Sequence, residues 1–282
     1  MAQNSIFTIE RRVDFIIEFR VFFEDIVETK VTTKMLGNIT FMNYLDRCIR
    51  YWPYRNGANS IDAYLKAINV DMTNPKCDKD LFLIMELIIN LLHWAPHQDF
   101  ADDQECEFDL AFKKNRVRIE SERLLTNAAY ILEKGCNMMI REISDGKNTQ
   151  YVITKRDSDV DAAITSVPML SDVLLGYLDV RNAEDLEYKE SSLLSIYSFM
   201  EPKRYKYKSI SCGSISEEFF IAMNQLGIRH KTDSQITIPS RSKRIVYDKL
   251  FRMAIFVLQA EKANQFKEDI KQLRTKHNTQ SN

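Results

Sequence analysis

Glycine and proline are scarce in this sequence, which has seven and six of them among 282 residues. Sheet-rich sandwiches and barrels need many turn residues, so the shortage disfavours both folds. Three common phosphate-binding and hydrolase motifs are also absent. No two glycines lie close enough to form G-x-x-x-x-G-K-[ST], G-x-G-x-x-G or G-x-S-x-G. We therefore predict no nucleotide or other cofactor.

Long hydrophobic runs and cysteine pairs are missing as well. The most apolar run, Leu81–Leu92, has twelve residues and includes Glu86, whereas a membrane-spanning helix needs about 20. Residues 1–20 carry charges every few positions, unlike a secretory signal peptide. None of the five scattered cysteines forms a C-x-x-C pair, which is typical of a reducing compartment. We predict a soluble, cytoplasmic protein with no membrane partner.

The near-neutral net charge of −1 hides an uneven distribution. Residues 201–282 contain 16 Lys and Arg against 8 Asp and Glu, a net of +8, whereas residues 1–200 have a net of −9. The two parts either attract each other or serve different partners.

Apolar residues recur at spacings of three and four through most of the chain, which predicts helices. The expected helices cover residues 8–29, 41–51, 61–69, 81–92, 116–134, 157–166, 169–178, 182–200, 216–226 and from about 242 onward. Ser60 and Ser216 are expected to begin helices, and Gly135 and Pro202 to end them. Ile119 is expected to point inward, residues 205–214 to form a linker, and the last helix to fray beyond residue 261. Two strand-like runs, NMMIREI and TQYVITK, flank the turn SDGKN and predict one small β-hairpin near residues 137–155. We therefore predict a mainly α multi-helix bundle in two helical lobes, residues 1–145 and 146–282.

Arg229 and His230 follow the expected end of a helix at Gly227. A cation suits the exposed carbonyl groups of a helix C-terminus, so both residues have a structural interpretation as a helix cap. The alternative is a nuclease site, with His230 as acid and base, Arg229 stabilising phosphate charge and Asn224 nearby.

The same region carries a resemblance to a known group of proteins. FFIAMNQLGIRHKTDSQ with the following YDKL, and upstream LLGYLDV and DLEYKESSLLSIYSFMEPKR, resemble bacterial helical proteins of the abortive-infection kind, which are discussed beside the HEPN ribonuclease superfamily. The resemblance covers about residues 146–260. It implies a role in phage defence or a related stress response.

This chain lacks the catalytic motif that a HEPN ribonuclease would need. HEPN nucleases carry Arg-x(4–6)-His, but no Arg lies five to seven residues before any of the four histidines. A relative without catalytic activity therefore fits the chain better.

Two basic clusters are candidates for contact with RNA or DNA. Cations can bind phosphates, and aromatic rings between them can stack on bases. The alternative is a solvated linker and a helix start. The candidate residues are Lys203, Arg204, Tyr205, Lys206, Tyr207, Lys208, Arg241, Lys243 and Arg244.

His93 and His97 are candidate ligands for a metal ion. Imidazoles four residues apart can share a metal ion when one helical face presents both. Pro96 lies between them and disfavours that helical geometry, so the main prediction is no metal.

Three functions remain open at this point. The leading hypothesis is a non-enzymatic or accessory protein of bacterial phage defence that acts through helical contacts, as a homodimer or with a protein partner, and offers its basic part to RNA or DNA. The second is a divergent ribonuclease that uses Arg229 and His230. The third is a structural or regulatory protein-interaction module.

Overall fold

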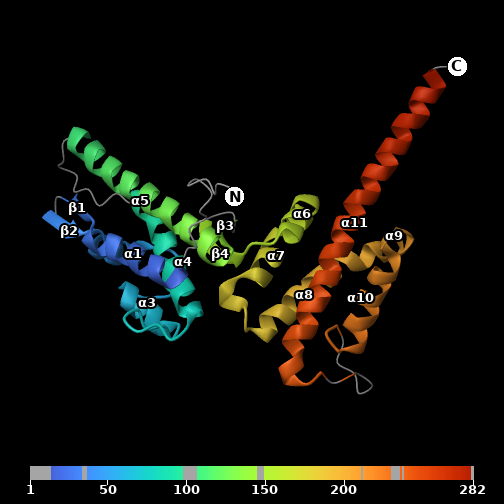
Figure 1. Cartoon of the computed structure of the whole chain (residues 1–282), viewed down its shortest axis with the longest axis horizontal. Helices are drawn as coiled ribbons and strands as arrows, with labels where there is room; N and C mark the ends of the chain where they lie inside the picture. The colour runs from blue at the N-terminus through green and yellow to red at the C-terminus, as the bar shows by residue number, and fades with distance from the viewer. Residues whose placement is uncertain are drawn as a thin grey trace, which may run out of the picture. The chain divides into compact units, whose positions relative to one another are not determined.

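The protein is mainly α-helical, as the sequence predicts (Figure 1). The computed structural model describes residues 14–33, 37–97, 107–144, 149–210, 212–229, 236 and 238–280. The chain forms two compact units, Met1–Arg156 and Asp157–Asn282. Among the residues described, no helix is both long enough and apolar enough to cross a membrane.

The N-terminal unit contains helices and two hairpins. Its elements are α1 (Phe15–Glu28), β1 (Lys30–Thr33), β2 (Gly37–Thr40), α2 (Phe41–Cys48), η2 (Ile49–Tyr51), α3 (Ile61–Ala67), α4 (Asp78–Trp94), η3 (Ala95–His97), α5 (Glu107–Cys136), β3 (Met138–Ser144) and β4 (Thr149–Lys155). Capping side chains begin several helices. Ser60 Oγ accepts the backbone N–H of Ala63 at 3.1 Å, as predicted for the start of α3.

A bidentate ion pair joins helices α1 and α5. The Arg123 guanidinium donates to the two carboxylate oxygens of Asp25 at 2.6 and 3.0 Å. These hydrogen bonds hold the pKa of Asp25 below its usual value, although partial burial opposes the shift. The pair lies where α5 packs against α1.

The predicted hairpin is confirmed, and a second hairpin was missed. β3 pairs with β4 in antiparallel register, with Ile140 opposite Ile153. The unpredicted pair β1–β2 sets Val31 opposite Ile39, with Gly37 at φ +63°. Its strands have four residues each, too few for alternation to show clearly in the sequence. The segment that connects them, residues 34–36, lies outside the described residues.

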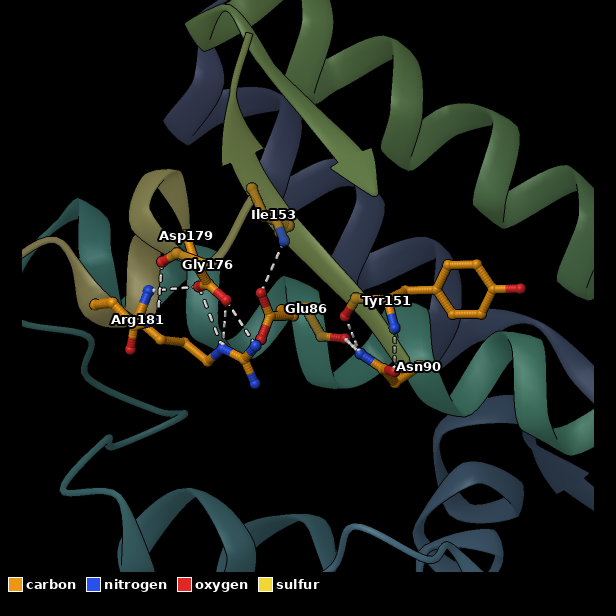
Figure 2. Close-up of polar contacts among 8 residues, drawn as sticks. Glu86, Asn90, Tyr151, Ile153, Gly176, Asp179 and Arg181 are labelled. Carbon is orange, nitrogen blue, oxygen red and sulfur yellow. Dashed lines mark hydrogen bonds and ion pairs between the residues drawn. The ribbon is translucent and has the colours of Figure 1, made fainter. Parts of the chain in front are cut away.

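Strand β4 is held against α4 by two buried polar side chains of that helix (Figure 2). Asn90 accepts the Tyr151 N–H at 2.8 Å and donates to the Tyr151 carbonyl at 2.6 Å. The Glu86 carboxylate accepts the Ile153 N–H at 2.8 Å. Asn90 therefore bonds to the outer edge of β4 as a neighbouring strand would.

This contact also explains where the first unit ends. The sequence placed the boundary near residue 145, inside the hairpin, but the first unit continues to Arg156. β4 belongs to it because α4 satisfies the backbone groups of β4.

The C-terminal unit is built almost entirely from helices. Its elements are α6 (Ser158–Ser166), η4 (Pro168–Leu170), α7 (Ser171–Leu178), η5 (Val180–Asn182), α8 (Leu186–Met200), η6 (Glu201–Lys203), α9 (Arg204–Ser209), α10 (Gly213–Gln225) and α11 (Ser240–Gln280). Its core joins α8, α10 and α11 through fully buried side chains such as Tyr197, Phe219 and Phe251. Pro202 lies just after α8, which ends at Met200 as predicted.

The turn after α7 is closed by a buried carboxylate. Asp179 accepts the backbone N–H of Arg181 at 2.8 Å and its guanidinium at 2.6 Å (Figure 2). Asn182 adds a hydrogen bond to the Gly176 carbonyl at 3.0 Å. These bonds fix the direction in which the chain enters α8.

Three expectations about this unit are wrong. Residues 205–214 were expected to form a linker, but most of them lie in α9 and at the start of α10. α10 begins at Gly213, so Ser216 is buried inside the helix and does not cap it. α11 was expected to fray beyond residue 261, but it is helical to Gln280.

Gly213 is required by the close approach of α9. A Cβ built at this position would lie 2.3 Å from the backbone carbonyl oxygen of Lys208. We expect Gly213→Ala to lower the free energy of unfolding by about 1–3 kcal/mol, because a backbone atom must move. Chemical denaturation followed by circular dichroism measures this. Ser214→Ala, an exposed neighbour, is the control. Equal stability of the two variants would show that the connection adjusts freely.

Candidate functional site

Arg229 closes the end of α10. Gly227 adopts φ +69°, after which the Arg229 N–H donates to the Met223 carbonyl at 3.2 Å. Ile228 folds back into the core cluster that contains Phe219, as the cap interpretation requires. The backbone of this segment therefore ends the helix in the expected way.

The Arg229 side chain binds helix α8 and the residue that follows it. Its guanidinium donates to the Tyr197 hydroxyl at 2.6 Å and pairs with Glu201 at 2.7 Å. It also lies over the Tyr197 ring, 4.9 Å from the centroid. The Tyr197 hydroxyl in turn donates to Glu201 at 3.0 Å. Arg229, Tyr197 and Glu201 form a closed triangle of charge-assisted contacts.

Asn224 belongs to the same cluster. Its amide donates to the Phe220 carbonyl at 3.0 Å, one helical turn earlier. Burial and the Glu201 carboxylate raise the pKa of Tyr197, while a hydrogen bond with Asn224 acts in the opposite direction. The structure thus brings Arg229 and Asn224 to one hydroxyl group. The third candidate, His230, lies outside the described residues.

These contacts occupy donors of the Arg229 guanidinium. Its guanidinium already binds a carboxylate and a hydroxyl, so a phosphate would have to displace Glu201. An arginine positioned for phosphate normally offers open donors in a bidentate arrangement.

The first basic cluster lies on η6 and α9, and Glu261 of α11 occupies much of it. Lys206 contacts Glu261 at 2.6 Å, Lys203 lies 3.8 Å from it, and the Tyr207 hydroxyl donates to it at 2.8 Å. Burial raises the pKa of Glu261, but the hydrogen bonds from Lys206 and Tyr207, together with the charges of Lys203 and Lys206, lower the pKa below its usual value. Tyr207 is fully buried and cannot stack on a base.

Of the remaining residues of this cluster, two contact other side chains of the C-terminal unit and one lies in solvent. Lys208 pairs with Glu217 at 2.9 Å, and the Arg204 guanidinium lies over the Phe220 ring at 5.0 Å. Tyr205 is 89% exposed. It is therefore the member of this cluster with an aromatic face open to a ligand.

The second basic cluster lies at the start of α11. Arg244 pairs with Glu184 and lies 3.9 Å from Asp248. Arg241 is exposed and Lys243 is half-buried. Within the described ranges, neither Arg241 nor Lys243 forms an ion pair.

The uneven charge of the sequence is largely balanced inside the C-terminal unit. Residues 157–282 contain 18 Lys and Arg against 17 Asp and Glu, because the acidic segment 157–190 folds with the basic segment that follows it. Arg252 pairs with Asp157 at 2.5 Å, and Arg244 pairs with Glu184. The +8 surplus counted over residues 201–282 is therefore not an uncompensated basic surface.

A buried lysine, which the sequence did not single out, joins three helices. Lys189 of α8 is 5% exposed, and its ammonium lies 3.0 Å from Asp248 of α11. It also lies 3.9 Å above the ring of Tyr177, whose hydroxyl donates to the same oxygen of Asp248 at 3.0 Å. Burial and the Asp248 charge raise the pKa of Tyr177.

The N-terminal unit has an open groove of about 610 Å³ beside α1. Its apolar lining includes Phe19, Phe23, Met72, Pro75 and Leu81. Its charged residues are Arg20, Glu24, Lys76 and Asp78, two of each sign. The groove therefore favours neither an anionic nor a cationic ligand.

His93 and His97 do not form a metal site with the residues described. His93 stacks on the Tyr151 ring with centroids 3.6 Å apart, and His97 lies in the short helix η3. Within the described part of the chain, no three His, Cys, Asp or Glu side chains are grouped to hold a metal ion. Most of the acidic stretch that follows, residues 98–106, lies outside it.

His93 should make the stability of the protein depend on pH. Burial lowers its pKa to about 4 from 6.5, with a smaller contribution from the nearby His97. The unfolded chain therefore binds a proton below pH 6.5 that the folded chain does not, and stability falls as the pH falls towards 4. We expect a loss of about 1–2 kcal/mol between pH 7 and pH 5, measured by urea denaturation.

His93→Phe is the variant that isolates this effect. It keeps an aromatic ring beside Tyr151 but removes the titrating group, so the variant should lose most of the pH dependence between 7 and 5. His97→Gln should keep it. Identical pH profiles of His93→Phe and the unsubstituted protein would refute the assignment.

No family model, curated protein or solved structure matches this chain.

Proposed function

We propose that this chain is a non-enzymatic accessory protein that binds another protein through the C-terminal half of α11. The supporting observation is that α11 is 41 residues long but, within the described part of the chain, contributes buried side chains to the core only from its first half. Among the side chains described, the last buried one in α11 is Leu258, and none from Ala263 to Gln272 is buried. Figure 1 shows this half of α11 extending past α9 and α10.

An exposed helical segment of this kind is unfavourable for a free protein unless a partner binds it. An isolated helix is marginally stable in water, and exposed apolar residues on it promote nonspecific association. Phe266 and Ile270 nevertheless lie exposed on this half, one helical turn apart. A role in bacterial phage defence or a related stress response rests on the resemblance of residues 146–260 to abortive-infection proteins.

Truncation after Lys262 tests this function. We expect the truncated chain to keep the melting temperature of the full chain within a few degrees, because none of the side chains described in the removed segment, from Ala263 to Gln272, is buried. Bacteria that produce the full chain should resist a phage panel, and bacteria that produce the truncated chain should not. Equal resistance with both chains would exclude the end of α11 as the functional part, and absence of resistance with the full chain would contradict the defence role.

Binding of RNA or DNA is a second candidate, favoured by the exposed Tyr205 and by Arg241. Fluorescence anisotropy with a labelled single strand should then show binding that weakens as salt rises. Tyr205→Ala with Arg241→Ala should weaken it, and Lys262→Ala with Lys267→Ala is the control for charge removed elsewhere. Cleavage of the strand that Arg229→Ala abolishes would instead favour the ribonuclease alternative.

A further inference from the structure

The exposed half of α11 carries the spacing of a coiled-coil helix. Phe256, Ala263, Phe266 and Ile270 follow one another at intervals of seven, three and four residues, which places them at a, a, d and a of a heptad. Phe256 is 49% exposed, Phe266 57% and Ile270 51%. We name these four residues the α11 seam. It runs for about 21 Å along the helix.

Helix α6 contacts α11 beside the beginning of the seam. Gln259, at the intervening d position, donates to the backbone carbonyl of Asp159 in α6 at 2.7 Å. From Ala263 onward, no described side chain of the seam is buried. A partner helix can therefore pack against Ala263, Phe266 and Ile270 by knobs-into-holes contacts.

The residues that flank the seam are mainly cationic. In this heptad Lys262 and Asp269 occupy g positions, and Lys267 occupies an e position. The Lys262 ammonium lies 5.8 Å from the centre of the Phe266 ring, beside the seam. Asp269 is the one anion among these three and accepts a hydrogen bond from Gln265 at 2.9 Å.

These flanks disfavour a second copy of the same helix. A parallel pair places Lys262 of one copy beside Lys267 of the other, because g and the following e position face each other. An antiparallel pair centred on Phe266 and Ile270 places Lys267 beside Lys267 and Asp269 beside Asp269. Like charges at these positions suppress pairing, whereas glutamate or aspartate on a partner would pair with both lysines.

We propose that the α11 seam binds an amphipathic helix of another protein that carries apolar a and d residues and acidic flanking residues. The inference rests on the proposed function and specifies the chemistry of the partner. It assigns contact to Phe266 and Ile270 and selectivity to Lys262 and Lys267.

Two synthetic peptides test this proposal with the full chain. Both contain four heptads with leucine at a and d; one has glutamate at e and g, and the other has lysine. We expect the glutamate peptide to bind at least about tenfold more tightly in fluorescence anisotropy, with the difference shrinking as salt rises. Lys262→Glu with Lys267→Glu should reverse the preference.

Matched variants separate the seam from the rest of the helix. Phe266→Ala with Ile270→Ala should weaken binding of the glutamate peptide by at least about tenfold, without loss of helix propensity. Glu268→Ala with Gln272→Ala, which alters the opposite face, should not weaken it. Circular dichroism of each variant confirms that α11 is still helical.

Three results would overturn the inference. They are equal affinity for the two peptides, no binding of the glutamate peptide at 100 µM, and a dimer in sedimentation that Phe266→Ala with Ile270→Ala dissociates. The last result would assign the seam to a second copy of this chain. If truncation after Lys262 abolishes phage resistance while neither peptide binds, the proposed function stands and the acidic partner helix does not.

Discussion

Replacing Asp248 by alanine is expected to lower the free energy of unfolding of the C-terminal unit by about 3 kcal/mol. The substitution leaves the Lys189 ammonium inside the fold without its carboxylate, at a position that is 5% exposed. The Tyr177 hydroxyl loses its acceptor at the same time. Because the Asp248 side chain is itself 46% exposed, water can partly replace it, and the loss should lie at the lower end of the range for buried pairs. Urea denaturation of the unit measures the change.

A double substitution distinguishes the buried charge from simple loss of contacts. Lys189→Met added to Asp248→Ala removes the ammonium and keeps an apolar stem of similar length, so it should recover much of the lost stability. Glu184→Ala, which breaks the exposed pair with Arg244, should change stability by less than about 0.5 kcal/mol. If the double variant is no more stable than Asp248→Ala, the destabilisation does not come from an unpaired Lys189.

Replacing Asn90 by alanine is expected to destabilise the N-terminal unit by about 2–4 kcal/mol. The substitution removes both hydrogen bonds that the side chain makes to Tyr151, as well as the one to the Glu86 carbonyl. The backbone N–H and carbonyl groups of Tyr151 then lose their partners at the edge of β4. Hydrogen exchange should report the change locally, as faster exchange of the Tyr151 amide.

Asn127→Ala is the matched control for this substitution. Asn127 lies on α5 and is exposed, so its replacement should be neutral or slightly stabilising. Unchanged exchange at Tyr151 in Asn90→Ala would show that the edge of β4 does not depend on this side chain.

The start and end signals of helices were predicted well where they depend on neighbouring residues. Ser60 caps α3 and Gly227 ends α10, as expected from their types alone. The end of α5 shows the limit of this approach. The sequence suggested Gly135, but the left-handed position is Asn137, at φ 54°. Both residue types tolerate that conformation, and the strand that follows selects between them.

Helical periodicity predicted the helices better than it predicted which faces are buried. Ile119 is expected to point inward, and Phe256 belongs to the apolar pattern that predicts the last helix, yet they are 52% and 49% exposed. An apolar stripe wider than the neighbouring helices can cover leaves some of its members in solvent. For Phe256 that exposure starts the α11 seam.

The candidate site was only partly predictable. Arg229 and Asn224 do lie together, but their shared partner is Tyr197 on another helix, 32 residues away from Arg229. The sequence leaves the basic cluster at Lys203–Lys208 open between RNA or DNA contact and a solvated linker. It does not predict that Glu261 of α11 contacts this cluster. The backbone of Arg229 ends α10 as local geometry predicts, but its side chain contacts Tyr197 and Glu201 instead of the exposed carbonyl groups of the helix.

The sequence by itself determined the helical class, the β3–β4 hairpin and most helix boundaries, because propensity, capping and apolar period act within a few residues. Only the tertiary structure decided how the charges are used. Lys189 meets Asp248 across 59 residues, and Asp157 meets Arg252 across a longer separation still. Such pairs form when packed helices bring their faces together, and the Coulomb energy of a pair depends on that distance and on burial. A count of charges along the chain contains neither quantity.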